Sequence, residues 1–402
     1  MANSRFSGKW SEKSLSDLAV VTMGQSPSSI FYNSRGEGLP LIQGNADIES
    51  RKTVERVWTT EGNKRCDSGD LILTVRAPVG AVAVASKNVC IGRGVCGLKP
   101  FGDSSFLFHA LVYAENRWQA LEQGSTFTAA NSEQVGQFQI LVPDDEHEQR
   151  AIAEALSDVD GLLSSLEALI AKKRAIKQAV MQQLLTGKTR LPGFSRAWVT
   201  VQMGQIGSIY GGLSGKTKID FEGGNARYMT FLGVLENVIL NIQHTEPVYV
   251  GPSESQNRVM KEDVLFNASS ETPGDLAIGA VMGEQLDNLY LNSFCFGFRI
   301  HDKDKYVPLF LAYFFRGNVG RDIMNALAQG ATRYNMSKSQ FRALELSIPS
   351  GAEQYAIASV LSDMDAEIAA LEKRQDKTRA IKQGMMQRLL TGRVRLLKNG
   401  VE

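Results

Sequence analysis

Two stretches of this 402-residue chain, 205 positions apart, are near copies of one another. Residues 148–187 align without a gap on residues 353–392, and 23 of the 40 aligned positions are identical. The shared runs are Glu-Gln at the start, then Leu-Ser-Asp, Ala-Ile-Lys-Gln and a final Leu-Leu-Thr-Gly. This spacing far exceeds the ~20–50-residue period of a solenoid. The chain is therefore two half-chains in tandem, each a variable region followed by a nearly constant segment.

Both repeated segments are predicted to be long helices. Apolar residues recur with a heptad period over residues 152–170 and again, in the same register, over residues 357–371. Such a seam packs against another helix. The apolar spacing then slips and resumes at Ile176 in the first copy and Ile381 in the second. The slip predicts a stutter that locally unwinds the supercoil.

The ends of these helices carry start and stop signals. Each segment follows a proline, Pro143 or Pro349, and finishes at a glycine, Gly187 or Gly392. About 40 residues at ~1.5 Å each make a rod of roughly 60 Å. The matching seams predict an antiparallel coiled coil of the two copies, with a pseudo-two-fold axis relating the halves. The alternative is two unrelated surface helices of one globular body.

The regions between the helices are predicted to be globular and mostly β-rich, which gives an α+β fold. Buried strands are expected over residues 71–75, 81–85, 264–266 and 294–300. A helix is expected late in each region, over residues 106–122 and 308–328. The predicted divisions are a first globular domain, a central helical region, a second globular domain and a C-terminal helical region, at residues 1–143, 144–192, 193–349 and 350–402.

Composition excludes several classes of protein. The net charge is +1, so binding to nucleic acid must come from local patches. Four cysteines without a CxxC pair fit reduced thiols in a cytoplasmic protein, and four scattered histidines do not suggest a metal site. The sequence has no signal-peptide core near its start and no apolar run of the ~20 residues that a membrane helix requires.

No trustworthy catalytic signature is present. The chain has neither a GxxxxGK[ST] phosphate loop nor the Asp-Pro-Pro-Tyr type of motif found in amino-methyltransferases. The glycines at 92–94 and 211–212 lack a strand-glycine-helix context, so turn formation is the better interpretation. Asp70 has no partner at the spacing of a nuclease and is predicted to be a turn residue before a strand. We therefore expect no catalytic residue, no metal and no cofactor.

Polar loops next to the predicted strands are the candidate functional residues. Their side chains are of the kinds that read base edges and hold phosphates. Ordinary solvated loops are the alternative for any single one. The candidates in the first domain are Gln25, Ser26, Ser28, Gln43, Asn45, Arg76, Arg93, Ser125, Thr126, Thr128 and Asn131. The candidates in the second domain are Ser214, Lys216, Lys218, Arg227, Tyr228, Thr230, Arg333, Tyr334, Asn335, Ser337 and Lys338.

Several motifs together resemble a known family. They are Glu-Gln after Pro143 and Pro349, the paired Ala-Ile-Lys-Gln and Leu-Leu-Thr-Gly runs, and, in the first domain, Gly-Gln-Ser-Pro at 24–27, Gly-Asp-Leu-Ile at 69–72 and Gly-Ser at 124–125 with Asn131. This layout resembles the specificity subunit of type I restriction–modification systems over essentially the whole chain. The second domain departs from the pattern, because no proline follows Ser214 and residues 262–265 lack the glycine.

The resemblance implies a role in DNA reading without catalysis. Each domain would read one half of a bipartite asymmetric site in double-stranded DNA, and the helices would act as a spacer ruler. Two methyltransferase subunits and then restriction/translocase subunits would assemble on this frame. Those partners, not this chain, would bind S-adenosylmethionine and ATP.

Two other classes remain open. One is a free-standing enzyme, which methylation or cleavage by the purified chain alone would reveal. The other is a DNA-binding scaffold or regulator that acts without methyltransferase partners. The sequence does not give the bases recognised or the spacer length.

Overall fold

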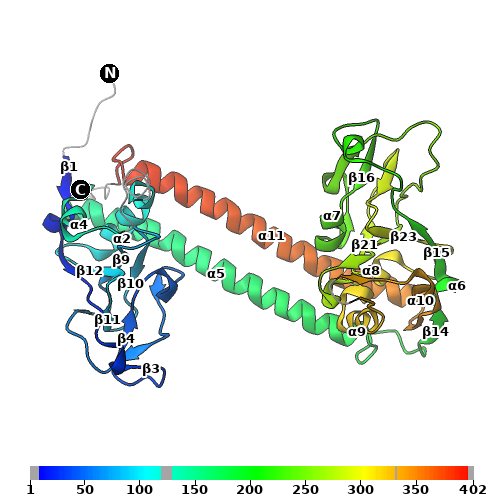
Figure 1. The fold of residues 1–402 in the computed structure, drawn as a ribbon, viewed down its shortest axis with the longest axis horizontal. Helices are drawn as coiled ribbons and strands as arrows, with labels where there is room; N and C mark the ends of the chain where they lie inside the picture. Colours follow the sequence, from blue (N-terminus) through cyan, green and yellow to red (C-terminus); the bar gives the residue numbers. More distant parts are fainter. Residues whose placement is uncertain (1–8, 119–128, 331–332, 397–402) are drawn as a thin grey trace. The chain divides into compact units, whose positions relative to one another are not determined.

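The structure is a computed structural model that describes residues 9–118, 129–330 and 333–396. The chain packs as two units, one made of Met1–Glu167 with Lys373–Glu402 and the other of Ala168–Glu372. Each unit holds one β-rich domain and half of each of two long helices (Figure 1). The predicted α+β fold is confirmed, and the predicted domain limits stay predictions.

The first domain begins and ends on a two-stranded ribbon. In its described residues a six-stranded sheet has the order β2-β12-β9-β10-β6-β5, a five-stranded sheet has the order β3-β7-β4-β11-β8, and β1 pairs with β13. The strands are β1 (Trp10–Ser14), β2 (Ala19–Met23), β3 (Tyr32–Asn33), β4 (Leu39–Ile42), β5 (Ile48–Glu49), β6 (Lys52–Thr53), β7 (Trp58–Thr59), β8 (Arg65–Cys66), β9 (Leu71–Thr74), β10 (Val82–Val84), β11 (Val89–Ile91), β12 (Val95–Pro100) and β13 (Gln139–Pro143). The helices are α1 (Leu15–Leu18), α2 (Ser104–Tyr113) and α4 (Ser132–Gln137), with 3-10 turns η1 (Ser29–Phe31) and η2 (Asn45–Asp47).

The second domain repeats this plan. Its described residues form sheets of order β15-β23-β19-β21-β17, β18-β16-β22, β14-β25 and β20-β24. The strands are β14 (Val199–Gln202), β15 (Gly207–Gly211), β16 (Ala226–Met229), β17 (Ile239–Leu240), β18 (Thr245–Val248), β19 (Val264–Asn267), β20 (Ser269–Ser270), β21 (Gly279–Met282), β22 (Leu289–Leu291), β23 (Cys295–Ile300), β24 (Tyr334–Asn335) and β25 (Glu345–Ile348). The helices are α6 (Met203–Ile206), α7 (Phe231–Glu236), α8 (Pro308–Arg316), α9 (Asn318–Ala326) and α10 (Lys338–Ala343), with turns η3 (Lys218–Phe221), η4 (Ile242–His244) and η5 (Pro273–Asp275).

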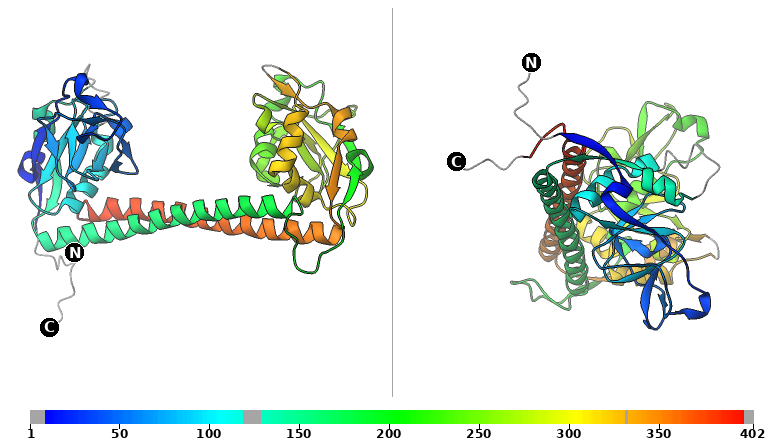
Figure 2. Two further views of the ribbon diagram at one scale, coloured as in Figure 1. Left: turned by 90° about the horizontal axis from the view of Figure 1, so that it is seen from below. Right: turned by 90° about the vertical axis from the view of Figure 1, so that its left-hand side faces the viewer.

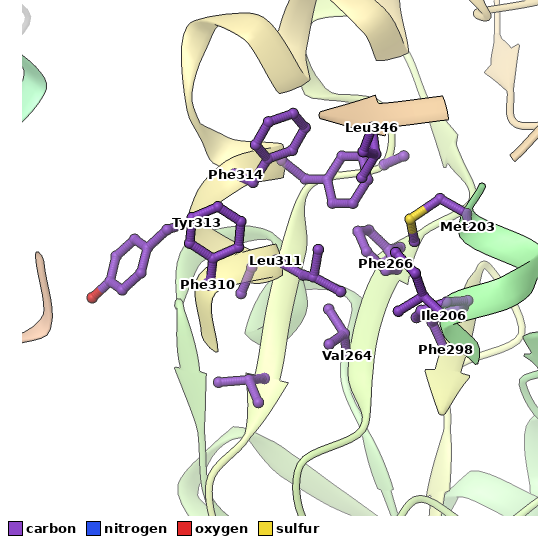
Figure 3. Close-up of a cluster of buried hydrophobic side chains, with 14 of the residues drawn as sticks. Met203, Ile206, Val264, Phe266, Phe298, Phe310, Leu311, Tyr313, Phe314 and Leu346 are labelled. Atoms are coloured by element: carbon purple, nitrogen blue, oxygen red, sulfur yellow. The ribbon is translucent and has the colours of Figure 1, made fainter. Parts of the chain in front are cut away.

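The two domains share one strand topology. The run β2-β12-β9-β10-β6 in the first corresponds to β15-β23-β19-β21-β17 in the second, and in each run only the last pair is parallel. The core of the second domain lies between the central sheet and α8, where Phe266, Phe298 and Leu311 are fully buried (Figure 3). The expected strands are present because their residues are buried in continuous runs, as for β9 and β19. Asp70 is a turn residue as predicted, and its carboxylate accepts a hydrogen bond from the backbone N–H of Asp67 at 2.9 Å.

The single helices expected late in each domain are wrong. In the first domain α2 ends at Tyr113, a turn follows, and the chain is helical again over residues 115–118. In the second, α8 and α9 are separated at Gly317, whose backbone is extended (φ −74°, ψ 161°). A Cβ on Gly320 would lie 2.2 Å from the carbonyl oxygen of Phe314. The chain therefore folds back tightly on α8, an approach that apolar periodicity does not reveal.

The repeated segments form helices α5 (Glu146–Leu184) and α11 (Gly351–Leu389) of 39 residues each. Both end as predicted, because Gly187 and Gly392 adopt left-handed φ angles of 67° and 68°. The buried seam of α11 runs on through Gln375 and Thr378. The apolar residues after the supposed slip, Ile176 and Ile381, are instead 41% and 50% exposed.

The predicted stutter is therefore wrong, because lysines continue the seam with the heptad period. In the second unit Lys173 pairs with Glu367 at 2.6 Å and Lys177 pairs with Asp365. In the first unit Lys382, which repeats Lys177, pairs with Asp160 at 2.6 Å. Each partly buried ammonium has a carboxylate partner. A lysine can therefore occupy a seam position, where an apolar residue is usual, without leaving an unpaired ion.

Within each unit the two helices run antiparallel, side by side along one side of the domain (Figure 2). In the first unit Ile152 and Leu156 near the start of α5 lie in one core cluster with Leu389 at the end of α11. In the second unit Leu361 near the start of α11 shares a cluster with Leu184 at the end of α5. The first turns of the apolar seam of each helix thus pack against the last turns of the other helix.

The repeated Glu-Gln pair explains how each helix start is fixed. Glu148 is 2% exposed and accepts two hydrogen bonds from the guanidinium of Arg395, just after the end of α11. The next residue, Gln149, donates to the carbonyl of Pro143 at 2.9 Å. A tryptophan, Trp10, lies against Gly392, where a Cβ would be 3.1 Å from its ring. We call the contact of Trp10, Glu148, Gly392 and Arg395 the first clasp.

The second unit contains the same arrangement. Arg190 donates to Glu353 at 2.5 and 2.6 Å, Gln354 donates to the carbonyl of Pro349 at 2.8 Å, and Trp198 lies against Gly187. In this second clasp, Arg190 and Trp198 belong to the segment that connects α5 to β14, the first strand of the second domain. The first clasp instead joins the two terminal regions of the chain, so the first unit needs both its N-terminal strand and the residues after α11.

A buried histidine joins the first domain to the helix pair. His109 of α2 is 1% exposed, its Nε2 lies 3.1 Å from Ser157 Oγ, and its Nδ1 lies 3.9 Å from Asp160. The equivalent ring in the second unit is Tyr313, whose hydroxyl donates to Asp365 at 2.7 Å. The pKa of His109 is lowered from 6.5 to about 4, mainly because the ring is buried; the charge of Asp160 opposes this shift and that of Lys382 adds to it.

This pKa shift predicts a loss of stability in mild acid. Above pH 6.5 His109 is neutral in both states, but between pH 6.5 and 4 the unfolded chain takes up the proton and the folded protein does not. We expect about 2–3 kcal/mol of unfolding free energy to be lost over this interval. Thermal melts of wild type and His109→Phe across this range measure it. The variant should show a flatter slope, whereas His147→Gln, at an exposed position, should match wild type. Parallel slopes for all three proteins would contradict the assignment.

None of the helices within the described residues combines the length and the apolar character that crossing a membrane requires.

Candidate nucleic-acid interface

One turn in the first domain gathers the predicted polar loops. Residues 92–94 between β11 and β12 form this central turn, and its backbone touches loops that are far apart in sequence. Gln25 N–H donates to the Ile91 carbonyl at 2.9 Å, Gly92 N–H to the Ile42 carbonyl at 2.8 Å and Val75 N–H to the Gly94 carbonyl at 2.9 Å. Ala130 N–H then donates to the Val75 carbonyl at 2.8 Å. The loops that carry Gln25, Gln43, Arg76, Arg93 and Asn131 therefore meet at one place.

Glycine is required at this meeting point because the backbones touch. A Cβ on Gly94 would lie 1.9 Å from the carbonyl oxygen of Gln43. A Cβ on Gly24 would lie 2.1 Å from the carbonyl oxygen of Gly92. The interpretation of the 92–94 glycines as turn formers is confirmed, and the reason is this close approach.

The side chains at this place are mostly exposed and polar. Gln25, Gln43, Asn45, Arg76 and Arg93 are exposed. Among the described residues, neither the Arg76 nor the Arg93 guanidinium has a hydrogen-bond, ion-pair or ring partner. Two cations held on a tight backbone and free of carboxylates can contact phosphate or the acceptor edge of guanine.

Other candidates in the first domain help to build the loops. Ser26 Oγ accepts from the backbone N–H of Arg93 at 3.1 Å, and Asn131 caps α4 by accepting from Gln134 N–H at 2.9 Å. Ser28 is exposed at the start of η1. Ser125, Thr126 and Thr128 lie outside the described residues. As DNA contacts, all of these residues stay predictions.

We call this meeting of loops at the central turn the junction. The second domain builds the same junction with other side chains. Its central turn is residues 292–294, and the equivalent backbone bonds are Leu213 N–H to Leu291 at 2.7 Å, Asn292 N–H to Met229 at 3.1 Å, Ala268 N–H to Phe294 at 2.7 Å and Met336 N–H to Ala268 at 3.0 Å. Gly212 replaces Gly24, with a Cβ position 2.0 Å from the Asn292 carbonyl oxygen. The three loops that carry Ser214, Thr230 and Ser337 therefore also meet at one place.

Several predicted residues of the second domain bind within the protein. Lys216 donates to Glu254 at 2.6 Å and holds the pKa of that carboxyl near 2. Arg227 donates to Thr245 Oγ1 at 2.5 Å. The Tyr228 hydroxyl donates to Glu246 at 2.7 Å, and burial together with this carboxylate raises the pKa of Tyr228 to about 12.

The remaining candidates of the second domain lie around its central turn. Thr230 caps α7 and Ser337 caps α10. Tyr334 and Asn335 form β24, which pairs with β20. Arg333 is exposed, and its guanidinium carbon lies 5.0 Å from the centre of the Phe294 ring. The other exposed candidates are Ser214, Lys218, Asn335 and Lys338.

Three residues at these junctions were missed by sequence reasoning. Phe294 was expected in the buried strand over residues 294–300, but it precedes β23 and is half exposed within the second central turn. Ser269 takes the place of Arg76 and is buried, with no hydrogen-bond partner for Oγ among the described residues. Lys64 lines a surface hollow beside Gln25. No local motif marks them, because their equivalence or proximity comes from strand pairing.

The exposed arginines give the first testable prediction for this surface. Arg93→Ala or Arg76→Ala should weaken DNA binding by about 5- to 100-fold if the lost group makes a bidentate base contact, and should relax one base position. A lost phosphate contact should weaken all sequences alike and reduce the salt dependence. Titrations at two salt concentrations separate these results. Lys99→Ala, which removes an exposed ion pair with Asp67 on the same domain, is the control. Arginine variants that bind like wild type would remove both residues from the site.

The comparison with known proteins finds the same division of the chain into two similar halves. The family model for the type I restriction modification DNA specificity domain matches residues 7–178 and again residues 195–380. The putative type I restriction enzyme MjaX specificity subunit of Methanocaldococcus jannaschii is 36% identical over 174 residues, which are 42% of this chain and 41% of that protein. The chain thus matches only about two fifths of that relative's length. The MjaVIII specificity subunit of the same organism is 23% identical over 310 residues, 73% of this chain and 71% of that protein.

A solved structure shares the fold. The crystal structure of the type-I restriction-modification system S subunit from M. genitalium superposes with a TM-score of 0.62 over 96% of this chain and 98% of that one, at 16% identity. Because two matches of the family model together cover most of the sequence, the chain belongs to the family of type I restriction modification DNA specificity domain proteins.

Proposed function

We propose that this chain is the non-catalytic specificity subunit of a type I restriction–modification complex. Each domain reads one half of a bipartite, asymmetric site in double-stranded DNA. The observation that carries this proposal is the junction built twice, with equivalent backbone hydrogen bonds but different exposed side chains. One scaffold that presents Arg76 and Arg93 in one copy and Phe294 and Arg333 in the other suits two different target sequences.

The helix pair has the second role in this proposal. It sets the number of base pairs between the half-sites and is the frame for two methyltransferase subunits, followed by restriction/translocase subunits. Two equivalent hollows support a pair of docking places. One is a hollow of about 700 Å³ lined by His109, Asp160 and Lys382, and the other is about 690 Å³, lined by Tyr313, Asp365 and Lys177. The partners carry S-adenosylmethionine and ATP chemistry, so this chain needs no cofactor.

Co-expression with an adenine methyltransferase subunit tests the proposal. We expect a complex with two methyltransferase copies per chain and methylation of a split site in mapped DNA. Exchange of residues 1–143 for the corresponding domain of another family member should change one half of that site and leave the other half and the gap unchanged. A change in both halves would contradict independent reading by the two domains.

A DNA-binding scaffold or regulator that acts without methyltransferase partners is the alternative. It predicts sequence-specific binding by the chain alone and no stable complex with the methyltransferase. Methylation or cleavage by the purified chain alone would contradict both proposals.

A further inference from the structure

Phe294 is an apolar side chain at the centre of a polar surface. The residue is 50% exposed, although the next residue, Cys295, begins a buried strand. The backbone of Phe294 is fixed on both sides, because its N–H donates to Asn292 Oδ1 at 2.9 Å and its carbonyl accepts from Ala268 N–H at 2.7 Å. The ring therefore cannot withdraw into the core without breaking the junction on which the second domain is built.

Arg333 lies over this ring, and Phe294 is still half exposed with the guanidinium in place. Its guanidinium carbon is 5.0 Å from the ring centre, within the range of a cation–π contact. Within the described part of the chain this guanidinium has no carboxylate partner. The contact thus presents a flat apolar group and a cation next to each other on the surface proposed to face DNA.

The first domain excludes a side chain at the equivalent position. Gly94 stands there, and its Cβ position is 1.9 Å from the Gln43 carbonyl oxygen. In the second domain the residue that replaces Gln43 is Thr230, whose hydroxyl accepts from Gly233 N–H at 3.0 Å to cap α7. At this place the second domain therefore exposes the aromatic ring of Phe294, whereas the first domain exposes the side-chain amide of Gln43.

We propose that Phe294 is a specificity-determining residue of the second domain that contacts the 5-methyl group of a thymine in its half-site. This inference rests on the proposed function. The thymine methyl is an apolar group on a base edge in the major groove, and phenylalanine is one of the side chains that read it. Arg333 accompanies the ring and holds a neighbouring phosphate or guanine. A rigid, half-exposed ring suits this contact because it loses little conformational freedom on binding.

The test removes only the methyl group. Once the site is mapped, each thymine of the second half-site is replaced by deoxyuridine, and binding by the complex with its methyltransferase subunits is titrated. For wild type we expect a loss of about 3- to 5-fold at one thymine, since one apolar carbon leaves the interface. Phe294→Gly should bind the thymine site correspondingly more weakly and should no longer distinguish thymine from uracil at that position. Phe294→Leu should keep part of the discrimination.

Matched controls separate this contact from a general defect. Phe101, 66% exposed beyond the far end of β12, is a phenylalanine outside the junction, and Phe101→Leu should bind like wild type. Deoxyuridine in the first half-site should affect wild type and Phe294→Gly equally. Thermal melts establish that Phe294→Leu and Phe294→Gly are folded.

Several results would overturn the inference. They are a second half-site without a sensitive thymine, a methyl effect that persists in Phe294→Gly, or a loss of affinity in Phe294→Gly that is the same for every sequence. The last result would mean that the ring only supports the fold or stacks on an unpaired base. Failure of the complex to recognise any sequence would instead contradict the proposed function itself.

Discussion

Replacement of Arg395 by alanine is expected to destabilise the protein by about 3 kcal/mol, because the variant leaves the Glu148 carboxylate buried without its cation. The Arg395 side chain is 12% exposed and that of Glu148 is 1% exposed, so water cannot replace the lost partner. For a unit of this size the melting temperature should fall by about 6–12 °C. Differential scanning calorimetry measures the shift.

Two further variants decide whether the buried charge is the cause. Arg379→Ala removes an exposed ion pair with Asp376 on the same helix and should change the unfolding free energy by no more than about 0.5 kcal/mol. The double variant Arg395→Met, Glu148→Leu replaces both charges with apolar groups and should recover much of the loss. If Arg395→Ala and Arg379→Ala have the same melting temperature, the first clasp does not stabilise the contact of β1 and α5 with the residues after α11.

The second large effect is expected from a single methyl group at the centre of the first domain. Gly94→Ala places a Cβ 1.9 Å from the Gln43 carbonyl oxygen, so the loops that carry Gln43 and Arg93 must separate. We expect a cost of about 1–3 kcal/mol in folding and a loss of about 10- to 100-fold in sequence-specific binding, because the polar groups lose their common geometry. Binding titrations and thermal melts of the same preparation measure both.

The control for this variant is another glycine-to-alanine change. Gly161 lies in α5, and a Cβ there meets nothing within 4 Å. Gly161→Ala should bind DNA like wild type and should be slightly more stable, since alanine favours the helix. Unchanged site recognition by a folded Gly94→Ala protein would mean that the central turn does not organise the loops proposed to read DNA.

Local patterns in the sequence were sufficient to predict the two long helices. The heptad seam, the preceding prolines and the final glycines are all properties of neighbouring residues, so α5 and α11 begin and end where these signals predicted. The seam was misread after Ile170 because apolar periodicity does not recognise lysine as a seam residue. Lys173 and Lys177 occupy it only because Glu367 and Asp365, almost 200 residues away, supply their partners.

The sequence by itself determined that the chain has two equivalent halves and that long paired helices follow two β-rich domains, and it predicted polar loops as the candidate DNA-reading groups. Only the tertiary structure decided which of those groups meet. Ser26 and Arg93, or Ser269 and Asn335, are brought together by hydrogen bonds between strands and turns that lie 66 or more residues apart. Glycine, threonine and phenylalanine at such a junction look like ordinary loop or core residues in one dimension. Phe294 was missed for this physical reason: its place in the central turn is fixed by the hydrogen bond between its carbonyl and the N–H of Ala268, which lies between β19 and β20.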